Sequence, residues 1–391
     1  EDHDFDEINH IYLFNKKIEW KDKQGGATGE YNTQSILPLI DEIQSILHLD
    51  DSNVLMELLK NAYSQPTLTL ATRYLVNDIF GKYGLLIVDG NDKSLKQQYA
   101  DVIKDELLNQ HAVKLVNEQL QLLEAKGYKQ QAFPRDINLF YLTKNSRERI
   151  IKENSEFRIQ NSDLKFSESE ILIELENHPE RFSPNVILRP LYQQKILPSL
   201  AYIGGAGELS YWLQLKPVFD FYKVNFPQLL LRNSALLVNE KTSKKINKMG
   251  FEMLDFFKDI EILKKEFIAK NTSENIDVSS HKNEIENTFN KLKDLTKNID
   301  ASLVNTVGAE LQKSLQSIDG IQKRLIKSLK LKNETELNQM DKIKSQLFPF
   351  NNLQERVDNF SSYYAKYGQQ FIDDLIAEFD VYNKQFLMIQ D

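Results

Sequence analysis

The residues best suited to chemistry gather in Leu188–Lys216, a stretch rich in Pro, Gly, Tyr, Trp and Arg. Its centre is expected to form a short buried strand, Leu200–Ile203, followed by glycines and by a helix that Glu208 opens. Gly permits positive φ and close approach of a ligand to the backbone, so this junction is a candidate ligand site. Its spacing matches neither a dinucleotide-binding glycine motif nor a P-loop, and a plain tight turn is the alternative.

Polar side chains flank this junction on both sides. Arg189 and Lys195 offer positive charges that suit a carboxylate or a phosphate. Glu208 is favoured as an anion in a first helical turn, where it would orient a reacting amino group or simply cap the helix. We therefore take Glu208 as a catalytic candidate. The substrate-binding candidates are Arg189, Tyr192, Gln193, Tyr202, Gly204, Gly205, Tyr211 and Trp212.

A second group of acids, amides and imidazoles opens the chain. If a helix begins near Phe5, then Asp6, Asn9 and His10 share one face. An imidazole there could transfer protons, whereas the acids could also do no more than stabilise the start of a helix. The pattern is too weak to predict a metal site. The catalytic candidates of this group are His3, Asp4, Glu7, Asn9 and His10.

Two further places carry candidate residues. Asp89 follows the apolar run Leu85–Val88, and a carboxylate at the end of a buried strand lies where open α/β sheets bind ligands. A turn at Asp89 is the alternative. The polar and aromatic segment Phe348–Arg356 either holds a nucleotide or caps a helix after Pro349. Its nucleotide-binding candidates are Gln354, Glu355 and Arg356.

The elements that must position these residues change in character near Asn239. Before it, short apolar runs alternate with helical patterns, which predicts an α/β fold with a mostly parallel sheet covered on both faces. Ser167–Glu170 matches a capping box and predicts that a helix starts at Ser167. The expected strands are Gly84–Asp89, Ile137–Leu142, Val186–Leu188, Leu200–Ile203 and Leu229–Leu231.

After Asn239, apolar residues at helical spacing predict long helices. One seam runs unbroken from Ile246 to Phe267 with a heptad step, and a second runs from Ile285 to Leu329. The polar segment Asn271–Ser280 between them predicts the tip of an antiparallel helical hairpin. Pro349 should end the next helix, and residues 353–387 should form another. The long apolar stripes predict a homodimer.

Composition limits the class of protein. With 391 residues, the chain should form two or more domains. It has no Cys, which excludes disulfides, a thiol nucleophile and thiolate metal ligands. A net charge of −8 argues against binding nucleic acid or an anionic membrane surface. No apolar run approaches the length of a membrane span. We therefore expect a cytoplasmic protein.

Several blocks of the sequence resemble the BshC family, the cysteine ligases of bacillithiol biosynthesis. They extend from the first residue to the last expected helix, so the resemblance covers essentially the whole chain. Members of that family resemble this chain only after an N-terminal segment of their own, which we expect this chain to lack. The blocks are Glu1–His10, Lys82–Asp92, Ala132–Leu142, Leu188–Lys216, Phe226–Ser234 and Phe348–Arg356.

The resemblance implies a Rossmann-like α/β catalytic domain with helical connecting insertions over residues 1–239. It implies an antiparallel coiled-coil domain over residues 240–391, used in dimers. The implied reaction joins the carboxyl of L-cysteine to the amino group of glucosaminyl-malate. Amide formation from a free carboxylate is uphill, so ATP, released as ADP or AMP, is the expected cofactor.

Two other functions stay open at this point. One is a non-catalytic α/β scaffold with a coiled-coil interaction arm, and the other is an enzyme that transfers an aminoacyl group to a different amine. A pocket bounded by Glu1–His10, Asp89 and Leu188–Lys216 would favour an enzyme over a scaffold.

Overall fold

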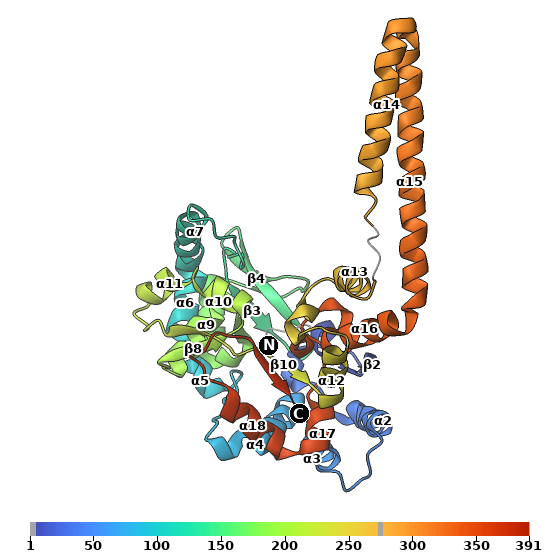
Figure 1. The fold of residues 1–391 in the computed structure, drawn as a ribbon. Coiled ribbons are helices and arrows are strands. Elements are labelled where there is room, and N and C mark those ends of the chain that lie inside the picture. Colours follow the sequence, from blue (N-terminus) through green and yellow to red (C-terminus); the bar gives the residue numbers. More distant parts are fainter. Residues whose placement is uncertain (1–4, 273–276, 391) are drawn as a thin grey trace. The chain divides into compact units, whose positions relative to one another are not determined.

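The computed structural model describes residues 5–272 and 277–390, and the chain divides into two compact units. The first unit comprises residues 1–235 and 358–387, and the second comprises residues 236–357 and 388–391 (Figure 1). We expected the division at residue 239 and assigned everything after it to the helical domain. Residues 358–387 instead belong to the first unit.

The first unit contains more than one apolar core. One is formed by a β-hairpin and by helices from both ends of the chain, and it buries Leu13, Leu55 and Tyr364. Its elements are β1 (His10–Leu13), β2 (Lys16–Glu19), α2 (Leu37–Leu47), α3 (Val54–Tyr63), α4 (Leu68–Phe80), α17 (Ser361–Tyr367) and α18 (Gln369–Glu378). Helix α1 (Phe5–Ile8) precedes them and buries Phe5 in a small separate cluster with Trp20 and Tyr31.

The larger core of the first unit is built from buried residues of the segment 99–219, among them Tyr99, Phe182 and Trp212. Its helices are α5 (Lys93–Gln97), α6 (Ala100–Asn109), α7 (His111–Glu124), α8 (Glu168–Asn177), α9 (Arg189–Ile196), α10 (Ala206–Trp212) and α11 (Lys216–Phe221). Its strands are β3 (Leu139–Leu142), β4 (Arg147–Glu153), β5 (Glu156–Ile159), β6 (Lys165–Phe166), β7 (Phe182–Pro184), β8 (Ala201–Gly204) and β9 (Gln228–Leu231).

The pairing of these strands differs from the mostly parallel sheet that we expected. The order β6-β5-β4-β3-β7 forms one sheet whose neighbours are all antiparallel. Short connections explain this: β4 turns into β5 through Asn154 and Ser155, both at positive φ, and so short a link permits only a hairpin. Among the described strands, β8 and β9 pair in parallel, and α10 and α11 form the crossover between them.

Three of the expected strands are confirmed, since β3, β8 and β9 overlap them. The other two expectations are wrong. The backbone after Gly84 is irregular through Asp89, and residues 186–188 form a turn that leads into α9. Strand β8 is also less buried than expected, because Leu200 beside it is 95% exposed and Ile203 is 51% exposed.

The start of α8 is confirmed at Ser167. The Glu170 backbone N–H donates to Ser167 Oγ at 3.3 Å, and the Ser167 backbone N–H donates to Glu170 Oε2 at 2.7 Å. These two bonds satisfy donors that a helix start leaves unpaired, which is the purpose of a capping box.

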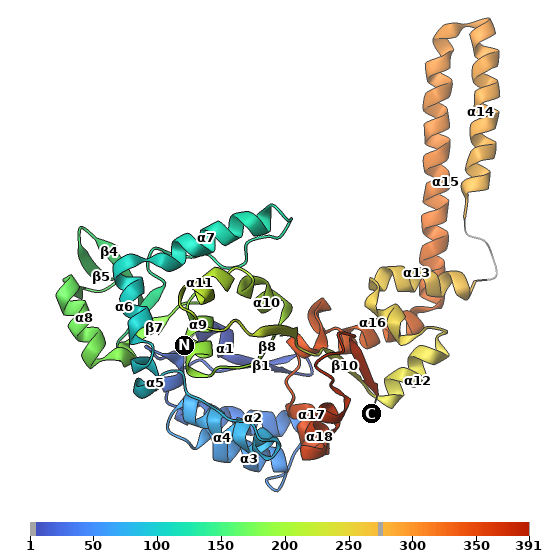
Figure 2. The same ribbon diagram turned by 90° about the vertical axis from the view of Figure 1, so that its left-hand side faces the viewer.

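The second unit is mainly helical. Helices α14 and α15 lie side by side as a long hairpin in both ribbon views (Figures 1 and 2). Two strands at the ends of this unit pair with each other. The elements of the unit are β10 (Ala235–Val238), α12 (Glu240–Lys248), α13 (Ile260–Lys270), α14 (Ser279–Ile299), α15 (Val304–Lys332), α16 (Glu334–Leu347) and β11 (Leu387–Gln390).

The helical hairpin turns at a different place from the one we expected. Its tip is the short 3₁₀ segment Ala301–Leu303, which lies inside the second seam, and Asn271–Ser280 is not the tip. Asp300 explains the break, because its extended backbone ends α14 and its side chain accepts a hydrogen bond from the Ser302 N–H at 2.9 Å.

The expected unbroken seam from Ile246 to Phe267 is also wrong. Gly250, at φ 74°, follows the end of α12, and a 3₁₀ turn separates it from α13. Ile246 and Phe267 are buried within this unit. The single helix expected over residues 353–387 is likewise broken, because Gly368 at φ 57° separates α17 from α18.

Helix α16 ends at Leu347, two residues before Pro349, so that expected helix end is confirmed. In the part of the chain that the structure describes, none of the helices combines the length and the apolar character needed to cross a bilayer.

Candidate active site

Arg189 stands at the start of α9, where the chain turns out of strand β7. Asn185 fixes this turn, since its carbonyl accepts from the Arg189 N–H at 2.8 Å and its side chain accepts from the Ile187 N–H at 2.9 Å. Pro190 follows in the first turn of the helix, where a missing N–H costs nothing. The backbone of Arg189 is therefore firmly placed, and its side chain is 23% exposed.

The Arg189 side chain joins residues from three elements. Its guanidinium donates to Gln193 Oε1 at 3.0 Å and to the Tyr211 hydroxyl at 2.9 Å. Glu208 Oε1 lies 3.7 Å from the same guanidinium and accepts a short hydrogen bond from the Tyr202 hydroxyl. Five of the residues that the sequence singled out thus form one polar cluster, which we call the Arg189 cluster.

Tyr202 acts in this cluster as a neutral hydrogen-bond donor. Burial, and next the hydrogen bond to Glu208, raise the pKa of Tyr202 to about 12. The phenol therefore keeps its proton at neutral pH, and Glu208 places its negative charge between this phenol and Arg189. The arrangement holds the guanidinium in one orientation, as recognition of a planar anion requires.

A first pocket, which we call the Asp89 pocket, has a volume of about 420 Å³. It brings together Asp89, Arg189, Tyr192 and Gln193, all of which the sequence marked as substrate-binding candidates. Asp89 does not end a strand here but lies in a turn, where Asp89 Oδ1 accepts from the Asn91 N–H at 2.9 Å. The pocket is lined by Ala27, Gly29, Glu30, Thr69, Val88, Asp89, Gly90, Asn91, Pro184, Arg189, Tyr192, Gln193, Ile196 and Leu197.

A second pocket, which we call the arginine pocket, has a volume of about 590 Å³ and shares Arg189 with the first. Among the described residues that line it, Glu208 is the one carboxylate. Four guanidinium groups therefore face one negative charge, which makes this pocket suited to anions. The lining is Gln131, Ala132, Phe133, Arg135, Phe140, Arg147, Arg149, Asn185, Val186, Arg189, Glu208 and Tyr211.

Strand geometry explains why two of these arginines meet. Arg147 and Arg149 alternate along β4 and so point to one face of the sheet. Phe140 on β3 is the Cα partner of Arg149, and its ring centre lies 3.8 Å from the Arg147 guanidinium and 4.9 Å from that of Arg149. Stacking on an aromatic ring stabilises both cations and orders their side chains.

The candidates at the start of the chain lie in a different place. Helix α1 has a single turn, so the expected face shared by Asp6, Asn9 and His10 does not form, and His10 instead begins β1. The His10 ring contacts Asn9 through Nδ1 and Oδ1 at 2.9 Å, and both residues line a third, mostly apolar pocket of about 340 Å³. Glu7 is exposed. The candidates outside the described residues are His3 and Asp4.

Gly204 serves packing, and Gly205 does not adopt an unusual backbone angle. Gly205 has φ −71°, so the positive φ that we expected is absent. A Cβ on Gly204 would lie 2.9 Å from the Tyr202 ring and 3.0 Å from Leu209, so Gly204 makes room for these side chains. Trp212 is fully buried and stacks on Tyr202 with ring centres 4.1 Å apart, which corrects its expected role as a substrate contact.

The three candidates for nucleotide binding belong to the second unit. Gln354 is buried there, where it accepts from the Leu237 N–H at 2.9 Å and donates to the Leu237 carbonyl at 3.2 Å. Its amide thus supports β10, a role that is neither the nucleotide binding nor the helix capping that we expected of this segment. The Arg356 Nε lies 3.9 Å from Glu355 Oε1.

Several residues of the two pockets were missed by the sequence analysis. Arg147 and Arg149 could have been predicted to share one face of a strand, because the sequence Arg-Glu-Arg places them two residues apart. Arg135 lies within one of the family blocks. Asn91 lies in another of these blocks, two residues after Asp89. Glu30 carries no comparable signal, because only the tertiary fold brings it to the Asp89 pocket. Within residues 5–272 and 277–390, no three His, Asp or Glu side chains are grouped in a way that could hold a metal ion.

Comparisons with known proteins cover both units. Residues 1–233 match the family described as "Bacillithiol biosynthesis BshC, N-terminal Rossmann-like domain", and residues 235–390 match its "C-terminal coiled-coil domain". These matches confirm a Rossmann-like α/β part followed by a coiled-coil part.

Relatives named "Putative cysteine ligase BshC" are similar over nearly the whole chain. The protein of Flavobacterium psychrophilum is 42% identical over 96% of this chain and 71% of its own length. That of Christiangramia forsetii is 40% identical over 100% of this chain and 73% of its own length. The Bacillus mycoides protein is 26% identical over 97% of this chain and 73% of its own length. The chain therefore belongs to the BshC family of bacillithiol biosynthesis.

Proposed function

We propose that this chain is a cysteine ligase that joins the carboxyl of L-cysteine to the amino group of glucosaminyl-malate, forming bacillithiol. The names of its relatives support a ligase. The observation that carries the proposal is the position of Arg189 in the wall between the Asp89 pocket and the arginine pocket.

The two pockets suit the two ends of such an acceptor. Glucosaminyl-malate carries an amino group at one end and two carboxylates at the other. Asp89 and Glu30 offer negative charge to an ammonium group in the Asp89 pocket. Arg147 and Arg149 offer guanidinium groups to the malyl carboxylates in the arginine pocket. Arg189 would then bind the middle of the acceptor.

Activation of cysteine requires a further reagent, for which we propose ATP. The cysteine carboxylate attacks a phosphorus atom of ATP and releases either pyrophosphate or ADP. The acceptor amine then attacks the activated carbonyl, expels AMP or phosphate and loses one proton. The guanidinium groups of the arginine pocket are chemically suited to phosphate as well as to carboxylate. We propose the cytoplasm as the location.

The test is to incubate the protein with cysteine, glucosaminyl-malate and ATP and to measure bacillithiol by mass spectrometry. Product that requires all three compounds supports the proposal, and the release of AMP or ADP identifies the mode of activation. ATP consumption with cysteine and other amines, without bacillithiol, would indicate a different acceptor. No turnover with any amine, together with no binding of glucosaminyl-malate, would favour the scaffold.

We also propose that the α14–α15 hairpin joins two chains. Apolar side chains remain exposed on both helices, among them Leu295 at 56%, Ile299 at 75% and Ile321 at 51%. A two-helix hairpin has one contact face, and these residues lie outside it. A second copy of the hairpin would cover them.

A further inference from the structure

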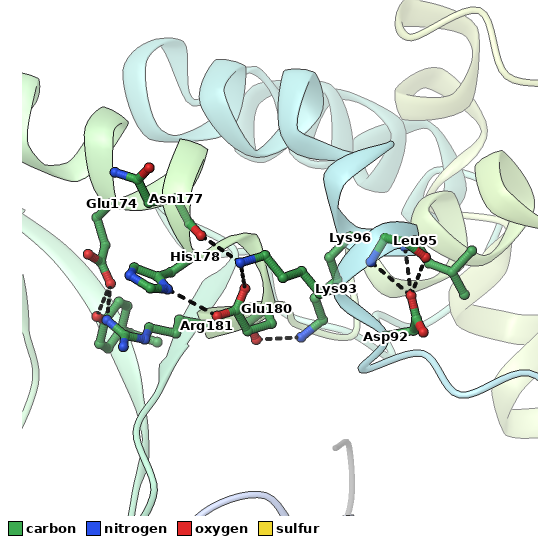
Figure 3. A network of polar contacts seen from close by, with 11 residues as sticks. Asp92, Lys93, Leu95, Lys96, Glu174, Asn177, His178, Glu180 and Arg181 are labelled. Atoms are coloured by element: carbon green, nitrogen blue, oxygen red, sulfur yellow. Dashed lines mark hydrogen bonds and ion pairs between the residues drawn. The ribbon is translucent and has the colours of Figure 1, made fainter.

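Lys96 is a buried cation behind the Asp89 pocket. It lies on α5, and only 1% of it is exposed. Burying an ammonium group is costly unless hydrogen bonds compensate. Lys96 Nζ donates to Asn91 Oδ1 at 2.8 Å and to the Glu180 carbonyl at 3.0 Å. The second of these bonds is drawn in Figure 3.

The first bond connects Lys96 to the wall of the pocket. Asn91 lines the Asp89 pocket, and its N–H donates to Asp89 Oδ1 at 2.9 Å. The carbonyl of Gly90 between them accepts from the Tyr192 hydroxyl at 2.9 Å. The loop 89–91 is thus held by Tyr192 on one side and by Lys96 on the other.

The second bond connects Lys96 to a segment that is well fixed. His178 Nδ1 lies 3.2 Å from Glu180 Oε1, and Arg181 Nη1 donates to Glu174 Oε1 at 2.6 Å, as Figure 3 shows. Glu174 belongs to α8, so the Glu180 carbonyl is anchored on the larger core of the first unit. Lys96 therefore links the loop 89–91 to this core and fixes where the loop lies.

We propose that Lys96 is a positioning residue, which acts through Asn91 to set Asp89 at the place where it meets the amino group of the acceptor. The assignment of that amino group rests on the function proposed above. The placement of the loop by Lys96 does not depend on that function, so the loop placement and the reaction can be tested separately.

Lys93 provides a matched control on the same helix. It donates to the Asn177 carbonyl at 2.8 Å and lies 3.6 Å from Glu180 Oε2, so it contacts the same segment as Lys96. Its side chain is 58% exposed, and both of these partners lie outside the loop 89–91. Lys93→Met thus removes a cation near Glu180 without removing the bond to Asn91.

The experiment compares Lys96→Met with Lys93→Met. Loss of a hydrogen bond from a charged donor should raise the KM for glucosaminyl-malate about 10- to 100-fold in Lys96→Met. Amide deuterium exchange over residues 89–92 should rise in the same variant. Lys93→Met should change the KM by less than about twofold and leave that exchange as in the wild type.

A second pair of variants covers the case in which Lys96→Met does not fold. Asn91→Leu removes the acceptor on a half-buried loop and should reproduce the rise in KM and in loop exchange. Asn91→Asp keeps the acceptor and should retain the loop protection. If both changes break one interaction, their effects in the double variant should not add.

Two results would overturn the proposal. One is a folded Lys96→Met protein with a lower Tm but with wild-type KM and wild-type exchange over residues 89–92, since Lys96 would then stabilise only the core. The other is a normal loop in Asn91→Leu. If the wild type makes no bacillithiol, the proposed reaction fails, but loop exchange and the affinity for glucosaminyl-malate still decide the role of Lys96.

Discussion

At the scale of single residues, Arg189 has the contacts expected of an anion-binding group. Arg189→Ala removes a charged hydrogen-bond donor. We therefore expect kcat/KM for the acceptor to fall, with a loss of transition-state stabilisation of about 1.5–3 kcal/mol. Lys195→Ala is the control, because Lys195 lies on the same helix and pairs with Asp101 at 2.6 Å. If folded Arg189→Ala and Lys195→Ala have the same kcat/KM for the acceptor, then Arg189 does not bind the substrate.

Glu208 can be tested through the tyrosine that it contacts. Burial and the Glu208 hydrogen bond raise the pKa of Tyr202 from an ordinary 10.0 to about 12. Glu208→Gln removes the negative charge, so the pKa of Tyr202 should fall, while burial continues to raise it and Arg189 to lower it. Ultraviolet titration of the phenolate measures this, with Tyr202→Phe identifying the signal. An unchanged titration would show that Glu208 does not govern Tyr202.

The same shift has a consequence for stability at high pH. A raised pKa in the folded state means that Tyr202 adds to the free energy of unfolding below pH 10. This contribution is lost as the pH rises through about 12. Glu208→Gln should make this loss of stability at high pH smaller. If the variant also keeps full activity, then Glu208 caps α10 and takes no part in the reaction.

The sequence predicted part of the site because some of its residues are close in the chain. Arg189, Tyr202 and Glu208 lie within twenty residues of one another, and a strand–turn–helix junction brings them together. Glu30 and the loop 89–91 come from segments far from Arg189 in sequence. Their meeting depends on tertiary packing, which single-sequence patterns do not encode.

At the scale of elements, Gly204 holds the strand–helix junction through packing. Gly204→Ala places a Cβ against Tyr202 and Leu209, so we expect the free energy of unfolding to fall by about 1–3 kcal/mol. Gly207→Ala in α10 meets nothing within 4 Å and should be neutral or stabilising by about 0.5–1 kcal/mol. Chemical denaturation of both variants measures the difference. A neutral Gly204→Ala would contradict the packing role.

Local signals predicted the ends of elements well, whereas periodicity alone did not. The capping box at Ser167 and the helix end before Pro349 are set by a few neighbouring atoms, so the sequence contains the whole cause. The apolar seams continue in sequence across Gly250 and Asp300, where the backbone leaves the helix. The spacing of apolar residues shows which residues share a buried face. It does not show whether one continuous helix connects them.

At the scale of the whole molecule, the exposed apolar residues of α14 and α15 predict self-association. We expect a dimer at micromolar concentration in analytical ultracentrifugation. Leu295→Glu combined with Ile321→Glu should shift it towards monomer, since buried charges without partners oppose association. Lys313→Glu on α15 is the control, because Lys313 is 70% exposed. A monomeric wild type would exclude this role for the hairpin.

The return of residues 358–387 to the first unit affects how the protein is made. Tyr364 and Ile372 complete a core whose other members come from residues 13–79. During synthesis, that core must wait for the ribosome to produce residues 236–357 before its last helices arrive. The helical hairpin, by contrast, is formed from neighbouring segments and can fold as soon as it emerges. The core that residues 13–79 begin is thus finished only after residues 236–357 have been made, and in the interval its apolar helices expose surface that is prone to aggregation.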